Sequence, residues 1–199
     1  MSLLLESIRL EDGKFENLFH HEQRMRRSLQ MLCGVSDNFD LEKLLNDLSV
    51  PQEGLFKCRI IYDDQSKQVE FLPYVRKEVT TLRLVEHDRV SYEFKFSDRR
   101  QIDRLFDLRK ACDDILIVKR GIVTDSSYAN IAFRKGNTWY TPWSPLLKGT
   151  YRQKLLDENK LIAEEIRRQD INSFDTFKLL NAMWRFDAPE LSVSNIVKN

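Results

Sequence analysis

Short apolar runs, each ended by turn-forming residues, recur along the chain and require a fold that contains β-sheet. Residues 3–10 form such a run, and the Asp12–Gly13 turn that follows returns the chain through Phe15 as a hairpin. Leu55–Tyr62 and residues 69–73 form a second candidate hairpin. The beginning of the chain is therefore predicted to contain a small antiparallel sheet.

Amphipathic segments lie among these runs and predict helices. Residues 19–32 mix leucine and methionine with arginine, and Gly34 supplies a stop. Residues 41–48 carry a leucine stripe, a third helix is expected to begin at an Asp98 cap, and a fourth covers residues 150–158. The mixture of elements predicts the α+β class.

The second half of the chain is expected to be richer in strands. Its apolar runs are residues 80–85, 92–96, 115–118, 131–133 and 138–140, with further strands near Leu161 and Phe177. The polar residues 124–130 are expected to form a loop. A boundary near residues 74–77 gives a small N-terminal α+β domain, residues 1–75, and a larger β-rich domain, residues 76–199.

Charge and composition narrow the class of protein. The chain has 32 Lys and Arg against 31 Asp and Glu, a formal net charge of +1, which argues against a nucleic-acid partner held by one strongly basic surface. No apolar run approaches the ~20 residues of a membrane span, and the start lacks a signal peptide's pattern, so we expect a cytoplasmic protein without a membrane partner. The three cysteines and three histidines show no metal-ligand spacing, so we expect reduced cysteines and no metal site.

Gly149 precedes the helix predicted over residues 150–158. The amides of Thr150 and Tyr151 would then lie at a helix N-terminus, where free N–H groups and the helix dipole suit a phosphate. Glycine also precedes helices for steric reasons alone, so both interpretations stay open.

Lys95 lies among aromatic residues, between Phe94 and Phe96. If its side chain points inward, partial desolvation favours a nucleophilic amine. Alternation along the predicted strand by itself favours an outward, solvated lysine.

Arg24 and Asp125 have the same ambiguity. Arg24 could bind a phosphate through two parallel hydrogen bonds, or belong to a solvated helix face with Arg26 and Arg27. Asp125 lies in a polar stretch where an aspartate commonly satisfies nearby backbone and sometimes faces a ligand.

Five motifs in one order change this balance. They are residues 6–13, the His21-Glu22-Gln23-Arg24-Met25 segment, residues 121–131, Trp139-Tyr140-Thr141-Pro142 followed by residues 147–152, and Asn181-Ala182-Met183. Together they resemble the fold-type IV pyridoxal-phosphate enzymes, the class IV aminotransferases and aminodeoxychorismate lyases. The resemblance covers nearly the whole chain and implies the two-domain fold of the D-amino acid aminotransferase-like enzymes.

The resemblance implies pyridoxal 5'-phosphate as cofactor and gives each candidate residue a role. Lys95 corresponds to the Schiff-base lysine and catalytic base, and Arg24 to the arginine of the family's His-x-x-Arg helix that holds the cofactor phosphate. Asp125 stands where the family usually has the glutamate that faces the pyridine nitrogen. Gly149, Thr150 and Tyr151 correspond to the loop and helix start that cradle the phosphate. Compared with the family, the chain is expected to lack the usual leading strand.

The implied reaction has a preferred form and two alternatives. The Asn181-Ala182-Met183 ending and the short chain favour a lyase that converts 4-amino-4-deoxychorismate to 4-aminobenzoate and pyruvate. The alternatives are a branched-chain or D-amino acid transaminase, and a non-catalytic relative that binds the cofactor or a partner. The family implies a homodimer acting on a small amino acid or aminodeoxychorismate. Arg76, Lys148 and Arg152 are candidates for the substrate carboxylate on charge alone.

Overall fold

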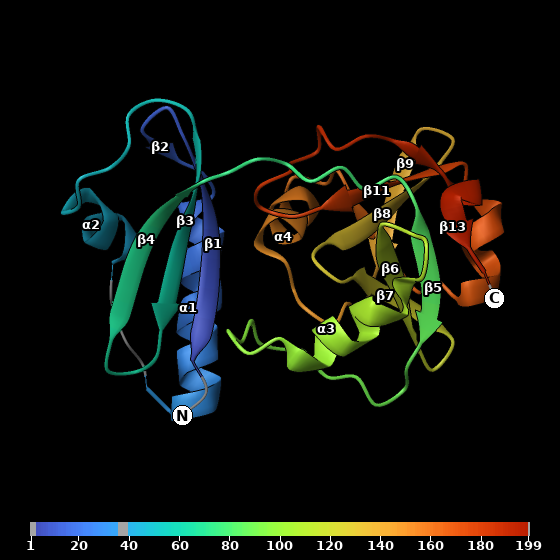
Figure 1. Cartoon of the computed structure of the whole chain (residues 1–199), viewed down its shortest axis with the longest axis horizontal. Helices are drawn as coiled ribbons and strands as arrows, with labels where there is room; N and C mark the ends of the chain where they lie inside the picture. The colour runs from blue at the N-terminus through green and yellow to red at the C-terminus, as the bar shows by residue number, and fades with distance from the viewer. Residues whose placement is uncertain (1–2, 36–39, 199) are drawn as a thin grey trace. The chain divides into compact units, whose positions relative to one another are not determined.

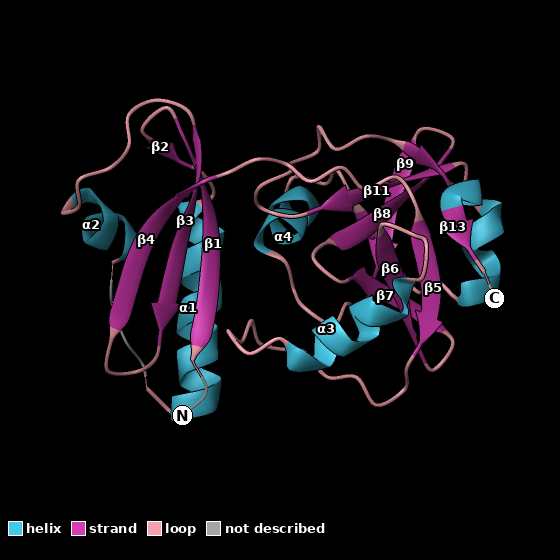
Figure 2. Cartoon of the chain, in the orientation of Figure 1, coloured by secondary structure: helices cyan, strands magenta, loops and turns pink. Residues whose placement is uncertain are grey.

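The computed structural model describes residues 3–35 and 40–198 (Figures 1 and 2). The chain divides into two compact units. Unit 1 contains the described residues up to Arg76 together with Phe94–Asp98, and unit 2 contains Lys77–Glu93 and the described residues from Arg99 onward. Both contain helices and sheet, so the predicted α+β fold is confirmed. In the part of the chain that is described, no helix is long and apolar enough to cross a membrane.

Unit 1 is an antiparallel sheet with helices on it (Figure 2). Its described strands follow the order β2-β1-β3-β4. The strands and helices of unit 1 are β1 (Leu4–Glu11), β2 (Lys14–Phe15), α1 (Leu18–Cys33), α2 (Leu41–Asn46), β3 (Leu55–Tyr62) and β4 (Lys67–Pro73). Asp12 and Gly13 both have positive φ, 47° and 75°, as a tight hairpin turn requires, so the predicted first hairpin is confirmed.

The core of unit 1 follows from alternation along β1. Every second residue of this strand is buried, so Leu4, Ile8 and Leu10 face the interior. Met25 and Leu29 of α1 pack in the same core. Glu6 has the same register as these apolar residues and is fully buried with them.

Unit 2 is a larger mixed sheet. Its described strands follow the order β10-β9-β8-β7-β6-β5-β13, with β11 pairing β8 and β12 pairing β11. The elements of unit 2 are β5 (Leu82–Glu86), α3 (Arg100–Phe106), η1 (Asp107–Arg109), β6 (Asp114–Lys119), β7 (Ile122–Ser126), β8 (Asn130–Lys135), β9 (Thr138–Pro142), α4 (Thr150–Asp157), β10 (Ile162–Glu164), η2 (Arg168–Ser173), β11 (Thr176–Leu180), β12 (Leu191–Ser192), η3 (Val193–Asn195) and β13 (Ile196–Val197).

The prediction of a strand over residues 92–96 is wrong. Phe96 forms only an isolated bridge with Leu4, and its amide bonds the carbonyl of Phe94 two residues back. That short-range bond bends the chain tightly, so the pleat of a strand cannot continue through Lys95. Phe94–Asp98 also cluster with unit 1, whereas a division at residues 75–76 places them in the second domain.

Two further expectations need correction. The cap of α3 is Arg99 rather than Asp98, and no side-chain hydrogen bond caps this helix. Residues 124–130, expected to be a loop, include the end of the strand β7. The polar sequence indicated a loop, but polar residues can lie in a buried strand when their hydrogen bonds are satisfied. The buried Thr124 hydroxyl, for example, donates to the Ile117 carbonyl at 2.9 Å.

The unit 1 core makes a testable difference between neighbouring positions of α1. Leu29 is fully buried and Met31 is 58% exposed on the same helix. Leu29→Ala should lower the free energy of unfolding by about 2–5 kcal/mol because it leaves a cavity. The matched Met31→Ala should stay within about 0.5 kcal/mol of wild type. Urea unfolding followed by circular dichroism measures both, and equal losses would contradict the packing described.

Candidate active site

A buried carboxylate is the centre of the polar cluster in unit 1. Glu6 of β1 accepts from Arg24 through both carboxylate oxygens, with Nε–Oε1 2.8 Å and Nη2–Oε2 2.6 Å. His21 Nδ1 lies 2.7 Å from Glu6 Oε2. An ionised carboxylate only accepts, so the imidazole donates this bond. The three residues are joined by charge-assisted contacts, and we name them the Glu6 cluster.

The helix α1 brings both partners to the carboxylate. His21 and Arg24 are three residues apart, which places them on one helix face, toward β1. Their burial differs along that face. His21 and Glu6 have fully buried side chains, while 14% of the Arg24 side chain is exposed. The Arg24 side chain therefore extends from the buried Glu6 carboxylate to the surface of unit 1.

The ionisation states follow from these contacts. Burial opposes the ionised form of Glu6, but the Arg24 charge and the hydrogen bonds from His21 and Arg24 outweigh it and lower its pKa to about 2. Burial also lowers the pKa of His21, against the attraction of Glu6. At neutral pH the cluster therefore contains one anion, one cation and a neutral imidazole.

Lys95 is held against the same strand. The Leu5 amide donates to the Lys95 carbonyl at 2.8 Å, and the Ser97 amide donates to the Leu3 carbonyl at 2.8 Å. Lys95 is partly buried, and its charge contributes to the lowered pKa of His21 after burial and the other neighbours. Unit 1 thus carries two of the predicted site residues, Arg24 and Lys95, and both contact β1.

Asp125 is one of two buried aspartates among the described residues of unit 2, the other being Asp114. Its Oδ1 accepts from Asn130 Nδ2 at 2.6 Å, and its Oδ2 accepts from the Leu147 amide at 2.9 Å. Burial raises its pKa to about 6, against these hydrogen bonds and the Arg152 charge. A cation near this carboxylate would favour its ionised form, which suits the role of facing a protonated pyridine nitrogen.

Gly149 is required by the close approach of Asn130. A Cβ at position 149 would lie 1.9 Å from Asn130 Oδ1, although the φ of −67° would suit any residue. Gly149 is the N-cap of α4, so the amides of Thr150 and Tyr151 belong to the first turn of this helix. Asn130 thus links Asp125 to the predicted phosphate cradle.

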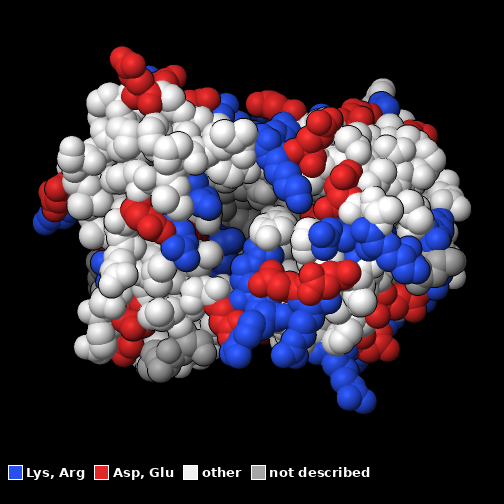
Figure 3. Space-filling model, viewed as in Figure 1, with Lys and Arg blue, Asp and Glu red and all other residues white. Residues whose placement is uncertain are grey.

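The other predicted cations of unit 2 lie differently. Arg152 is buried and donates to Thr141 Oγ1 at 3.2 Å and to the Pro142 carbonyl at 2.7 Å, so it supports the chain before α4. Its side chain is engaged by the protein, and the expectation that it meets a substrate carboxylate finds no support in these contacts. Lys148 is exposed, as is Arg76 of unit 1. Acidic and basic side chains are mixed on the face drawn in Figure 3.

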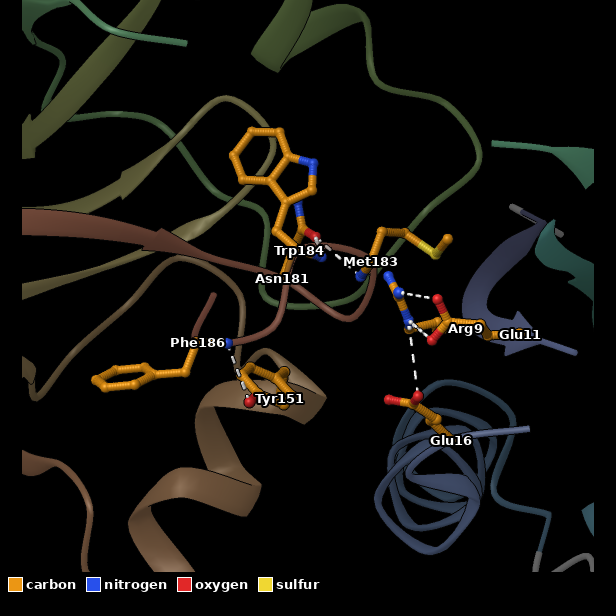
Figure 4. A network of polar contacts seen from close by, with 8 residues as sticks. All are labelled: Arg9, Glu11, Glu16, Tyr151, Asn181, Met183, Trp184 and Phe186. Atoms are coloured by element: carbon orange, nitrogen blue, oxygen red, sulfur yellow. Dashed lines mark hydrogen bonds and ion pairs between the residues drawn. The ribbon is translucent and has the colours of Figure 1, made fainter. Parts of the chain in front are cut away.

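The Asn181-Ala182-Met183 motif forms a turn after β11. Asn181 Oδ1 accepts from the amides of Met183 and Trp184, both at 2.9 Å, and the Tyr151 hydroxyl accepts from the Phe186 amide at 3.1 Å (Figure 4). The turn and the first residues of α4 are therefore tied together within unit 2.

Sequence reasoning missed two residues that organise the candidate site. Glu6 and Asn130 were quoted within motifs, but neither received a role. For Glu6 the signal was available, because a glutamate occupies the core register of an alternating apolar strand. For Asn130 no spacing rule predicts that its amide bridges Asp125 and the Leu147 carbonyl, at 2.6 and 2.9 Å.

The residues present fit pyridoxal phosphate by the chemistry of their groups. A guanidinium and a glycine-led helix start suit a phosphate, a buried carboxylate suits a cationic ring nitrogen, and a lysine amine suits an aldehyde. Gly149 lets the start of α4 approach Asn130, which also contacts Asp125, so the predicted phosphate cradle and the buried carboxylate are packed together within unit 2.

Comparison with known proteins gives a consistent result. Residues 77–186 match the sequence model of the family described as amino-transferase class IV. An uncharacterised protein of Haemophilus influenzae is 42% identical over 182 residues, which cover 90% of this chain and 97% of that protein.

Solved structures extend the comparison. A crystal structure from Haemophilus somnus 129PT, provisionally named a 4-amino-4-deoxychorismate lyase, is 37% identical, with a TM-score of 0.87 over 94% of this chain and 98% of its own. A pyridoxal-phosphate-bound hypothetical aminotransferase of Mycobacterium tuberculosis is 16% identical, with a TM-score of 0.78 over 96% of this chain and 80% of its own. The second likeness concerns the fold alone.

Ionised Glu6 should make the folded state sensitive to acid. Its pKa is about 2 in the fold against an ordinary 4.5, so its stabilising contribution is complete above pH 4.5 and is lost as the pH falls toward 2. The full contribution is about 3 kcal/mol. Glu6→Gln should flatten the dependence of unfolding free energy on pH between about 5 and 3. Denaturant titrations at each pH measure this; Glu11→Gln is the control, and an unchanged slope in Glu6→Gln would refute the assignment.

Gly149→Ala should destabilise unit 2 by about 1–3 kcal/mol because the new methyl group collides with Asn130. Asn130→Ala removes the colliding atom, so the double variant should be more stable than the two single losses predict when added. Thermal or urea unfolding of the four proteins gives the coupling. Strictly additive losses would show that the two residues do not meet.

Proposed function

Because the chain belongs to the class IV aminotransferase family of fold-type IV pyridoxal-phosphate enzymes, we propose that it is a lyase acting on 4-amino-4-deoxychorismate. The products would be 4-aminobenzoate and pyruvate. The family establishes a pyridoxal-phosphate-dependent enzyme, while the choice of reaction is the proposal.

One observation carries the choice of the lyase. The Haemophilus somnus structure that bears this name matches nearly the full length of both chains at 37% identity. The Asn181 turn supports it, because β11 pairs with β8 so that Leu180 lies opposite Asn130. Asn181, the first residue of the motif that resembles the lyases, therefore directly follows Leu180. Leu180 is paired with Asn130, whose side chain donates to Asp125.

We assign the phosphate and the ring nitrogen to different groups of this chain. As the family resemblance implies, Arg24 and the amides of Thr150 and Tyr151, after Gly149, would bind the phosphate. Asp125 would keep a proton on the pyridine nitrogen, since a cation beside this buried carboxylate favours its ionised form. When bound, pyridoxal phosphate supplies an electron sink that stabilises negative charge at the substrate carbon.

Lys95 would perform the proton transfer. Its amine would first hold the cofactor and then, once the substrate amine replaces it, accept the proton from the substrate carbon that bears the amino group. The bonds from the Leu5 amide to the Lys95 carbonyl and from the Ser97 amide to the Leu3 carbonyl fix the main chain at Lys95 and just after it.

The spectrum of the bound cofactor tests the role of Lys95. Wild-type protein incubated with pyridoxal phosphate and dialysed should retain a visible absorbance band, and Lys95→Ala should lose it. Lys14→Ala removes an exposed lysine of the same unit and should keep the band. A band that survives Lys95→Ala would place the cofactor on another lysine.

Product analysis of the same preparations separates the candidate reactions. Incubation with 4-amino-4-deoxychorismate should release pyruvate and 4-aminobenzoate in equal amounts, with at least 10³-fold less in Lys95→Ala, the scale expected when a catalytic base is removed. Keto acid formation from branched-chain or D-amino acids, without pyruvate release, would instead establish a transaminase. Retained cofactor with no turnover of any of these would favour the non-catalytic alternative. The homodimer that the family implies stays a prediction.

A further inference from the structure

We propose that Glu6 is a positioning residue that orients Arg24 toward the cofactor phosphate, with His21 fixing Glu6 in turn. The inference rests on the proposed function, because it takes the phosphate of pyridoxal phosphate to be the ligand of Arg24. It gives a role to the histidine of the His-x-x-Arg segment, which the assignments above leave unused.

Two contacts determine the plane of the guanidinium. Arg24 Nε and Nη2 meet the two oxygens of Glu6 at 2.8 and 2.6 Å, a paired geometry that fixes both the position and the rotation of the group. The side of the guanidinium that carries Nη1 is consequently turned away from Glu6. Because 14% of its side chain is exposed, part of Arg24 is accessible to a ligand at the surface of unit 1.

His21 completes the set without adding a second charge. Its Nδ1 reaches Glu6 Oε2 at 2.7 Å, so this oxygen accepts from both Arg24 and His21. A neutral imidazole leaves the Glu6–Arg24 pair balanced within the core, where a further buried cation would be costly. His21 therefore holds the carboxylate in the rotamer that Arg24 requires.

The strand β1 connects the Glu6 cluster to Lys95. Glu6 belongs to β1, and the amide of the preceding residue, Leu5, bonds the Lys95 carbonyl at 2.8 Å. One strand thus fixes the main chain of the amine-bearing residue and the side chain of the phosphate-binding residue within unit 1. A cofactor that uses both groups would gain from this fixed spacing.

Glu6 could in principle have the opposite effect on phosphate. Its negative charge opposes a nearby anion, so a residue that only neutralised Arg24 would weaken phosphate binding, and its removal would strengthen it. Orientation predicts the reverse, because an untethered arginine must lose rotamer freedom on binding, at a cost of up to about tenfold in affinity. The two roles therefore differ in the sign of one measurable ratio.

The measurement compares pyridoxal phosphate with pyridoxal, which lacks the phosphate. Dissociation constants for both ligands are obtained by equilibrium dialysis and absorbance titration, with no turnover required. Glu6→Gln should weaken pyridoxal phosphate binding about tenfold and change pyridoxal binding by less than about twofold. The control is Glu11→Gln, which removes the partner of Arg9 at 2.9 Å from the same strand and should leave both constants unchanged (Figure 4).

A pair of His21 variants keeps the inference testable if Glu6→Gln does not fold, as circular dichroism would show. His21→Asn retains a donor close to the position of Nδ1, whereas His21→Leu removes it. His21→Leu should lower the preference for pyridoxal phosphate over pyridoxal, and His21→Asn should restore much of it.

The possible results separate this inference from the proposed function. Equal weakening of both ligands in Glu6→Gln would reduce Glu6 to a structural role, and tighter binding of pyridoxal phosphate would show that it only neutralises Arg24. Either result overturns the inference and leaves the cofactor assignment intact. A wild-type protein without preference for the phosphorylated ligand would overturn both.

Discussion

The burial of the Glu6 charge is the constraint on which unit 1 depends. A carboxylate in a closed apolar core costs several kcal/mol unless it is paired and fully hydrogen-bonded. The chain meets this requirement with two residues of α1, three positions apart. The helix can therefore pack on β1 only in the register that brings His21 and Arg24 to Glu6. A group that is unfavourable by itself thus specifies how the helix sits on the sheet.

Two of the buried carboxylates among the described residues show how the partners of a carboxylate determine its ionisation. Glu6 and Asp125 are both removed from water, yet the pKa of Glu6 falls to about 2 and that of Asp125 rises to about 6. Glu6 contacts a guanidinium directly, whereas Asp125 accepts from an amide side chain and from a backbone N–H. Glu6 is thereby committed to a permanent ion pair, and Asp125 remains responsive to a cation that arrives with a ligand.

Sequence patterns predicted the local structure of the chain where one rule acted alone. The Asp12–Gly13 hairpin and the Gly34 end of α1 followed from backbone preferences, and Gly34 indeed has φ 69°. The expectation that polar segments form loops was wrong at β7. Asp125 and its neighbours are polar, but they are buried in a strand and their polar groups are hydrogen-bonded. A second prediction was wrong at Lys95, where aromatic alternation indicated a strand but a short-range bend and contacts from β1 determine the path.

The candidate site was predicted by residue type and order, but its connections were not. Motifs named Arg24, Lys95, Asp125 and Gly149, because each carries a group that the cofactor chemistry needs. The residues that join them, Glu6 and Asn130, act through contacts across 18 and 5 positions, and no periodic pattern encodes such a pair. One sign was nevertheless present: a charged residue in the core register of a strand requires a buried partner, and a His-x-x-Arg helix face offers two donors at the right spacing. Joining those two observations would have identified the Glu6 cluster from the sequence.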